Sequence, residues 1–261
     1  MTAAFPDNRL GAFAALSDDE RNFMLDLIGP ARTIPSGSII QEQGLPDPGL
    51  FVLHSGWAAG TIELINGSSQ IVKIHLPGDL MGTPSLPYER AMESFLALTT
   101  VEVSELSLTA LGKLFATHPR VGALLFVSAQ EEQDFLIERL ASVGRTEAPS
   151  RMAALLLHLQ SRLAAQVGIK SRRLEIPLSQ QQLGDVLGLS EIHVNRVLQQ
   201  MERDGFIRRD KRQFEILRAE ALRSLAGIPN RKLRRDHAWL PSPRSDEADA
   251  RARTVRMKIV R

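Results

Sequence analysis

The sequence predicts an α+β protein with an N-terminal antiparallel β-roll or jelly-roll barrel, then a long helix, and then a C-terminal winged helix-turn-helix. Three observations indicate this fold class. Short apolar runs separated by Gly, Pro and Asn fill residues 31–108, as in antiparallel barrels. Residues 120–144 contain no proline and one internal glycine, which is typical of a long helix. Residues 178–217 then give two short helices and a β-hairpin.

The barrel is expected to follow one short helix. Ser17 precedes three acidic residues and fits the N-cap of an amphipathic helix over residues 17–28. Asn66-Gly67 lies between two apolar runs, which predicts a β-hairpin. The expected strands cover residues 38–40, 50–53, 60–64, 70–74, 95–98 and 101–106.

Helical periodicity begins after Thr109, with expected helices at 109–117, 120–144 and 149–167 and a strand at 171–177. The helix at 120–144 has a sparse apolar stripe, which is typical of a helix that pairs with its own copy. Packing of the stripe on the barrel is the alternative. The stripe consists of Leu125, Ala129, Leu136, Leu140 and Val143, and Glu132 interrupts it.

Residues 178–203 carry the pattern of two helices joined by a tight turn. Ser179 and Gln182 form a capping box at the start of the first helix. Gly188 tolerates the left-handed backbone that ends a helix, and Leu189 fills the joint. Ser190 caps the second helix. Its expected inward residues are Val194, Val197, Leu198 and Met201.

The outer face of the second helix has the chemistry of a major-groove reader. Arg and Asn match the edges of guanine and adenine, so we expect Arg196 and Asn195 to contact bases. Hydroxyl, amide and imidazole groups near the helix starts are expected to hold phosphates. Lys211 lies among the cations of 208–212, at the tip of the predicted hairpin wing. The candidate DNA-binding residues are Ser179, Gln181, Ser190, Ile192, His193, Asn195, Arg196 and Lys211.

The charges divide the chain into an acidic N-terminal part and a basic C-terminal part. Residues 1–142 hold 8 Lys/Arg against 17 Asp/Glu, whereas residues 171–235 hold 14 against 8. The basic half favours a polyanion such as double-stranded DNA. An RNA-binding or purely structural protein is a further alternative. An aromatic content of 5% disfavours stacking on single-stranded RNA. The absence of cysteine excludes disulfides, zinc–thiolate sites and cysteine-ligated iron–sulfur clusters.

We expect a cytoplasmic protein that is not associated with a membrane. No apolar run approaches the roughly 18 residues that cross a bilayer. Charged residues interrupt the first thirty positions, so no secretion signal is expected there.

The stretch GLSEIHVNRVLQ (188–199) and the glycines of the barrel resemble the Crp/Fnr family of bacterial transcription regulators, over about residues 15–228. The glycines are Gly37, Gly44, Gly56, Gly67, Gly78 and Gly82. The resemblance implies a signal-sensing barrel of the cyclic-nucleotide-binding type, a homodimer, a palindromic promoter site and contact with RNA polymerase. Arg196 matches the base-reading arginine of the family. Ile192 stands where better-known members carry a base-contacting glutamate, so their operator sequence does not carry over.

The sensor departs from the family pattern for cyclic AMP. Ala91-Met92 stands in place of the Arg-Ser pair that holds the cyclic phosphate, and Arg90 is one position away. Thr83 follows Gly82, where the family has glutamate. Leu136 and Ile137 replace the helix hydroxyls that meet the purine. We therefore expect no cyclic AMP, and the signal stays unknown.

Two other readings stay open. A haem- or small-ligand-sensing regulator of the same fold would need one imidazole, which His54 or His75 could supply. A cupin-like barrel enzyme would need a His-x-His motif, and His54, His75 and His118 are isolated. Neither G-x-S-x-G nor a P-loop is present. We therefore predict no catalytic residues and no metal site.

Together these patterns predict four segments. They are a sensor barrel (1–119), a dimerisation helix (120–145), a winged helix-turn-helix DNA-binding domain (146–228) and a basic, disordered tail (229–261).

Overall fold

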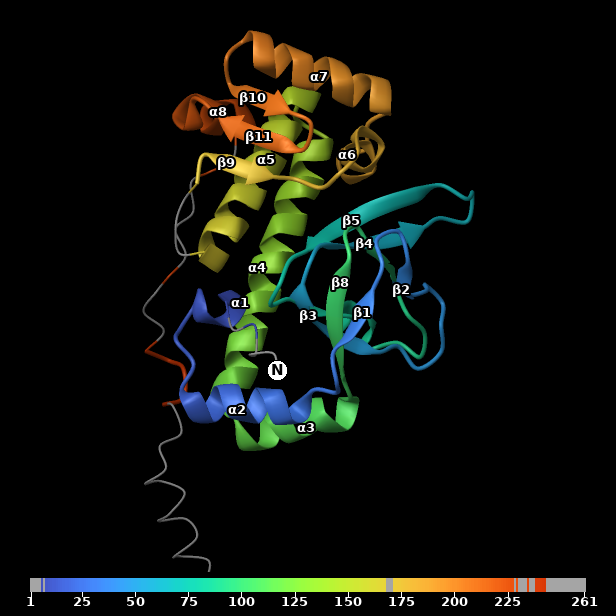
Figure 1. The fold of residues 1–261 in the computed structure, drawn as a ribbon, viewed down its shortest axis with the longest axis vertical. Coiled ribbons are helices and arrows are strands. Elements are labelled where there is room, and N and C mark those ends of the chain that lie inside the picture. The colour runs from blue at the N-terminus through green and yellow to red at the C-terminus, as the bar shows by residue number, and fades with distance from the viewer. Residues whose placement is uncertain are drawn as a thin grey trace, which may run out of the picture.

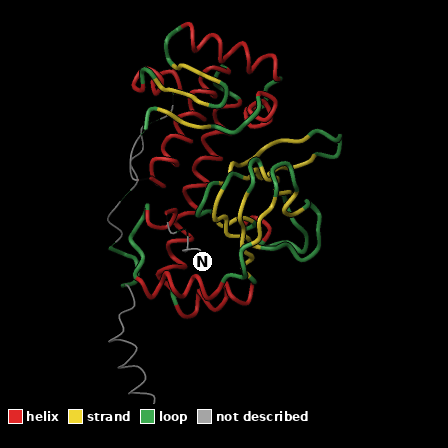
Figure 2. Tube along the Cα trace, viewed as in Figure 1, coloured by secondary structure: helices red, strands yellow, loops and turns green. Residues whose placement is uncertain are grey.

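The protein is described by a computed structural model that covers residue 6 and residues 8–167, 171–227, 229, 234 and 238–242. A β-barrel lies beside a long central helix, and a smaller, mainly helical domain lies at the far end of that helix (Figure 1). The same view coloured by secondary structure shows the strands of the barrel gathered on one side of the central helix (Figure 2). This arrangement confirms the predicted α+β class.

In the N-terminal part, helices come before and after the barrel strands in the sequence, and α2 and α3 lie together at one end of the molecule (Figure 1). Its elements are α1 (Asn8–Gly11), α2 (Asp18–Leu27), β1 (Arg32–Ile34), β2 (Ile39–Gln41), β3 (Leu50–Ser55), β4 (Ala58–Glu63), β5 (Ser69–His75), β6 (Leu80–Met81), the 3₁₀ turn η1 (Thr83–Ser85), β7 (Ser94–Ala97), β8 (Val101–Leu106) and α3 (Leu108–Thr117). Ser17 forms the expected N-cap of α2, in a capping box with Glu20. The short helix α1 was not expected from the sequence.

The barrel consists of two antiparallel four-stranded sheets, with strand orders β1-β8-β3-β6 and β2-β7-β4-β5. Apolar side chains from both sheets fill the space between them. They include Ile34, Phe51, Leu53, Phe95 and Val103. The predicted hairpin at Asn66-Gly67 joins β4 to β5, and Gly67 has the positive φ of 79° that this tight turn requires.

The long helix α4 (Pro119–Val143) confirms the predicted helix, but one expectation for its apolar stripe was wrong. Leu125 packs against a cluster with Leu50, Leu106 and Leu111 rather than facing outward. Phe126 is exposed in its place. The first half of α4 packs against α3, and that packing fixes which face turns toward the barrel.

The C-terminal part begins with a second long helix. Its elements are α5 (Ala148–Val167), β9 (Arg173–Glu175), α6 (Gln180–Leu187), α7 (Glu191–Arg203), β10 (Ile207–Asp210), β11 (Gln213–Ile216) and α8 (Ala219–Ala226). β9 is shorter than the expected strand at 171–177, and α8 was not expected. Its apolar core is continuous with residues on the barrel, among them Ile71, Ile74 and Leu76.

The predicted disordered tail falls almost entirely outside the described residues. Within its described part, Leu240 packs against the cluster that contains Leu10 and Phe13. No helix in the described ranges is both long enough and apolar enough to span a bilayer.

Candidate nucleic-acid interface

Local hydrogen bonds fix the two helices α6 and α7. The Ser179 hydroxyl accepts from the Gln182 backbone N–H at 3.1 Å, and the Gln182 side chain accepts from the Ser179 N–H at 2.8 Å. Gly188 ends α6 with a φ of 66°. Ser190 then caps α7 by accepting from the His193 N–H at 3.3 Å. The predicted caps and turn are therefore confirmed.

Helix α7 has one buried face and one solvent face. The buried residues are Val194, Val197, Leu198 and Met201, as the sequence predicted. On the opposite face Arg196 is exposed, and Ile192 is 83% exposed. The helix lies at the end of the molecule farthest from α2 and α3, on the outer side of α6 (Figure 1). A straight, exposed helix of this kind fits the DNA major groove.

Asn195 is less free than the sequence suggested. Its side chain is half-buried, and its Nδ2 donates to Gln180 Oε1 at 2.9 Å. This bond links α7 to the start of α6. A base-reading role for Asn195 stays a prediction, because the hydrogen bond engages its amide N–H. Sequence reasoning did not single out Gln180, since nothing in the local pattern reveals its partner 15 residues away.

The remaining helix-turn-helix candidates lie near the starts of the two helices. Ser179 and Ser190 are exposed N-caps, and Gln181 is exposed in the first turn of α6. His193 is half-buried in the first turn of α7. Backbone N–H groups at helix starts attract anions, so these positions suit phosphate contacts.

Strands β10 and β11 form the predicted wing, and β9 pairs with β11 as a third strand. Lys211 is exposed in the turn between β10 and β11, with a φ of 52°. Arg208 pairs with Glu215 at 3.2 Å, and Arg209 pairs with Glu202 at 3.6 Å. No described acidic side chain pairs with Lys211, so its charge is available at the wing tip.

The barrel positions that matter for an effector lie in and near β7. Ala91 is buried and Met92 is 41% exposed, so neither offers an anion a buried donor. Arg90 is exposed and donates to the Gly44 carbonyl oxygen at 2.9 Å. Next to them Glu93 is buried, and burial raises its pKa to about 7.

The two barrel histidines have different surroundings. His54 Nε2 lies 2.9 Å from the Ser104 hydroxyl, and burial lowers the pKa of His54 although Glu102 acts in the opposite direction. His75 is fully buried edge-on against Phe95, with ring centroids 5.5 Å apart. Burial also lowers its pKa, so the ring is neutral at pH 7. Among the described residues, no three His, Asp or Glu side chains gather as metal ligands do.

A barrel, a long helix and an exposed recognition helix with a basic wing define a DNA-binding transcription regulator of the winged-helix class. Comparison with known proteins specifies it further. The profile of the cyclic nucleotide-binding domain matches residues 31–118, and that of the Crp-like helix-turn-helix domain matches residues 150–225. Together the two profiles cover more than half of the chain. The chain belongs to the Crp/Fnr family of transcription regulators.

Individual relatives agree with this assignment. The chain is 26% identical to the transcriptional activator protein FnrA of Stutzerimonas stutzeri, over 82% of this chain and 87% of the relative. It is 28% identical to the nitrogen fixation regulation protein FixK of Rhizobium meliloti, over 82% and 99%. The solved structure of FixK2 from Bradyrhizobium japonicum superposes with a TM-score of 0.68 at 23% identity, over 77% of this chain and 98% of that one.

Proposed function

We propose that this chain binds a palindromic site in double-stranded DNA as a homodimer, with α7 in the major groove and the wing on the phosphate backbone. The observation that carries the proposal is the solvent face of α7, where Ile192 and Arg196 project from a helix that caps and core packing hold in place. Arg196 would donate to a guanine edge. Ser179, Gln181, Ser190 and Lys211 would bind phosphates and fix the register.

The exposed apolar face of α4 supports the homodimer. One chain alone leaves large apolar side chains in solvent along the second half of the helix. They are Leu136, Ile137, Leu140 and Val143, and Phe126 in the first half is also exposed. Leu136, Leu140 and Val143 follow one another at spacings of four and three residues, which fits a two-helix coiled coil. Pairing through this face would place two α7 helices at the same end of the dimer, about one DNA turn (~34 Å) apart.

We propose that the dimer acts in the cytoplasm and contacts RNA polymerase, and the name of one relative, a transcriptional activator protein, supports this role. We propose that cyclic AMP is not its signal. A cyclic phosphate needs fixed donors once it is desolvated. Ala91 and Met92 supply none, Arg90 is exposed and engaged with Gly44, and the buried acid Glu93 would repel an anion. The signal that acts on the barrel is left open.

Selection from a random duplex library, followed by gel shift, tests the DNA-binding proposal. We expect a palindromic consensus and no preference for single strands. Arg196→Ala should lose roughly 1–3 kcal/mol of specific binding and relax one base position. Arg203→Ala removes a cation from the last turn of the same helix and should keep the specificity. Unchanged operator affinity in Arg196→Ala would show that α7 does not read the site.

A further inference from the structure

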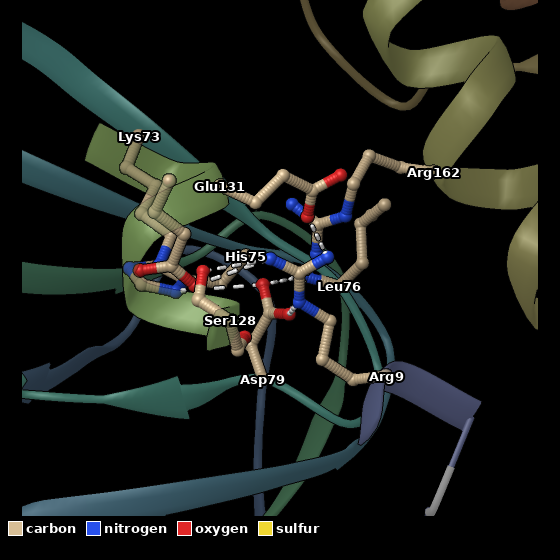
Figure 3. A network of polar contacts seen from close by, with 9 residues as sticks. Arg9, Lys73, His75, Leu76, Asp79, Ser128, Glu131 and Arg162 are labelled. Atoms are coloured by element: carbon tan, nitrogen blue, oxygen red, sulfur yellow. Dashed lines mark hydrogen bonds and ion pairs between the residues drawn. The ribbon is translucent and has the colours of Figure 1, made fainter. Parts of the chain in front are cut away.

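A buried ionic cluster lies where the barrel, the central helix and the DNA-binding domain meet (Figure 3). We call it the Asp79 cluster. It consists of Arg9, Lys73, Asp79, Glu131, Glu132 and Arg162, and the neutral ring of His75 lies beside Asp79. These side chains come from α1, β5, the turn before β6, α4 and α5. Charged groups are rarely buried unless they are paired, so the pairs define what this junction does.

Asp79 is at the centre and is 0% exposed. Its Oδ1 accepts from Arg162 Nη2 at 2.6 Å, and its Oδ2 accepts from the Leu76 backbone N–H at 3.0 Å. Arg9 Nε lies 3.7 Å from the same carboxylate. Burial raises the pKa of Asp79, but Arg162, Lys73 and Arg9 outweigh it, and the pKa lies well below its usual range. The carboxylate is therefore ionised and ties the barrel directly to α5.

The central helix joins the same cluster. Lys73 Nζ on β5 lies 2.5 Å from Glu132 Oε2 on α4. Arg9 pairs with Glu131 and donates to the Ser128 carbonyl oxygen at 3.2 Å. These contacts explain why Glu132 interrupts the apolar stripe, because it faces the barrel instead of solvent.

A second set of contacts fastens α6, the first helix of the helix-turn-helix, to the barrel hairpin. Gln70 on β5 donates to the carbonyl oxygens of Asp185 and Val186 near the end of α6. Arg139 on α4 donates to the Val72 carbonyl oxygen at 2.6 Å and also to that of Val186. Carbonyl groups at a helix C-terminus carry partial negative charge, which suits a guanidinium.

Both sets of contacts leave the reading helix free. α7 lies on the outer side of α6, away from the barrel (Figure 1), and its face with Ile192 and Arg196 stays exposed. The bridging contacts named above are made by side chains and backbone groups of the chain itself.

We infer that the Asp79–Arg162 pair, with Arg139 and Gln70, is a latch that holds the DNA-binding domain on its own barrel in the arrangement that binds DNA. This inference rests on the proposed function, because it takes α7 as the reading helix. Opening the latch frees the DNA-binding domain and lowers operator affinity.

The absence of cysteine allows a direct distance measurement. Glu42→Cys on the barrel and Ser224→Cys on α8 replace exposed residues and accept one spin label each. Full-length labelled protein, mixed with excess unlabelled protein, is measured by double electron–electron resonance. We expect one narrow distance distribution for the parent. Arg162→Gln should broaden it and weaken operator binding at least tenfold.

Glu20→Gln is the matched control. The Glu20–Arg120 pair is also buried, with a contact of 2.7 Å, but it joins α2 to α4 and does not reach the DNA-binding domain. This variant should keep the narrow distribution and the affinity. Gln70→Ala, a milder change on the hairpin, should broaden the distribution partly and covers the case in which Arg162→Gln fails to fold.

Two results would overturn the latch. One is a narrow distribution in both latch variants. The other is a broad distribution with unchanged operator affinity. Arg196→Ala separates the latch from the proposed function, because it should lose specific DNA binding and keep the narrow distribution. If the latch variants broaden the distance distribution but the parent protein binds no DNA, only the proposed function would be rejected.

Discussion

Glu93 is a carboxyl group buried in the barrel wall, where one of its oxygens, Oε1, has no hydrogen-bond partner among the described residues. It lies over Gly60, since a Cβ at that glycine would come within 2.4 Å of Glu93 Oε2. Burial raises the pKa of Glu93 to about 7, Lys73 lowers it, and Glu132 raises it further. The proton on Glu93 is therefore half lost near neutral pH.

This raised pKa predicts how stability depends on pH. The unfolded chain releases the proton near pH 4.5, whereas the folded protein keeps it up to about 7. The contribution of Glu93 is thus fully present below pH 4.5 and is lost as the pH rises to 7. Glu93→Gln keeps the shape and removes the titration. We expect it to be more stable than the parent at pH 8 by about 1–3 kcal/mol.

Urea denaturation at several pH values between 5 and 8 measures this difference. His75 and the other titratable groups are present in both proteins, so the difference isolates Glu93. It should shrink toward zero near pH 5. A difference that stays constant across the range would show that Glu93 does not titrate there.

At the scale of elements, the turn between α6 and α7 depends on a close approach of two backbones. A Cβ at Gly184, on α6, would lie 2.4 Å from the Leu189 carbonyl oxygen. We expect Gly184→Ala to force the two helices apart and to cost about 1–3 kcal/mol in the free energy of unfolding. Chemical denaturation of the full-length protein measures this loss of stability, and operator affinity should fall as well.

Gly112→Ala is the control for this prediction. Gly112 also lies within a helix, α3, but a Cβ there meets nothing within 4 Å. Alanine has the better helix propensity, so this change should stabilise the protein by roughly 0.5–1 kcal/mol. Equal effects of the two substitutions would mean that the close approach at Gly184 does not constrain the turn.

The sequence could predict the elements whose signals lie in neighbouring residues, such as helix caps and tight turns. Ser17, Ser179 and Ser190 each stand before a helix, and all three are N-caps in the structure. Helix α8 was missed because Arg218 stands at its N-cap position and makes no capping hydrogen bond through its side chain. The hairpin at Asn66-Gly67 was predictable for the same local reason as the caps.

The candidate site was predictable only where its residues are close in sequence. The reading face of α7 follows from helical spacing within 13 residues. The Gln180–Asn195 bond and the Asp79–Arg162 pair join positions 15 and 83 residues apart, and no periodicity in a single sequence links them. The missing Arg-Ser pair for a cyclic phosphate, in contrast, was visible from the residue types at 90–92, and the signal that acts on the barrel stays unknown.

At the scale of the whole molecule, α4 has one face packed inside the chain and one apolar face exposed to solvent. Its first half packs against α3 and the barrel, while Glu132 and Arg139 bind β5. Its second half has an exposed apolar face, where Leu140 is 78% exposed. In the proposed homodimer this face would pack against a second copy. A dimer would therefore form along a helix whose other face carries the latch.

Leu140→Glu tests this arrangement. In a two-helix pair the two Leu140 side chains would face each other, so the variant would bury two like charges. We expect dimerisation to weaken by about 2–3 kcal/mol or more, and sedimentation at micromolar concentration should find monomer. Operator affinity should fall with dimerisation, because one half-site alone supplies too little binding energy.

Ala141→Glu adds the same charge to the next position on α4, which is exposed and lies about 100° around the helix from Leu140. It should leave the dimer intact and the operator affinity unchanged. The latch adds a further expectation, because it lies within one chain. The Leu140→Glu monomer should keep the narrow barrel-to-α8 distance of the parent. Loss of both the dimer and the narrow distance in one variant would mean that the two faces of α4 are not independent.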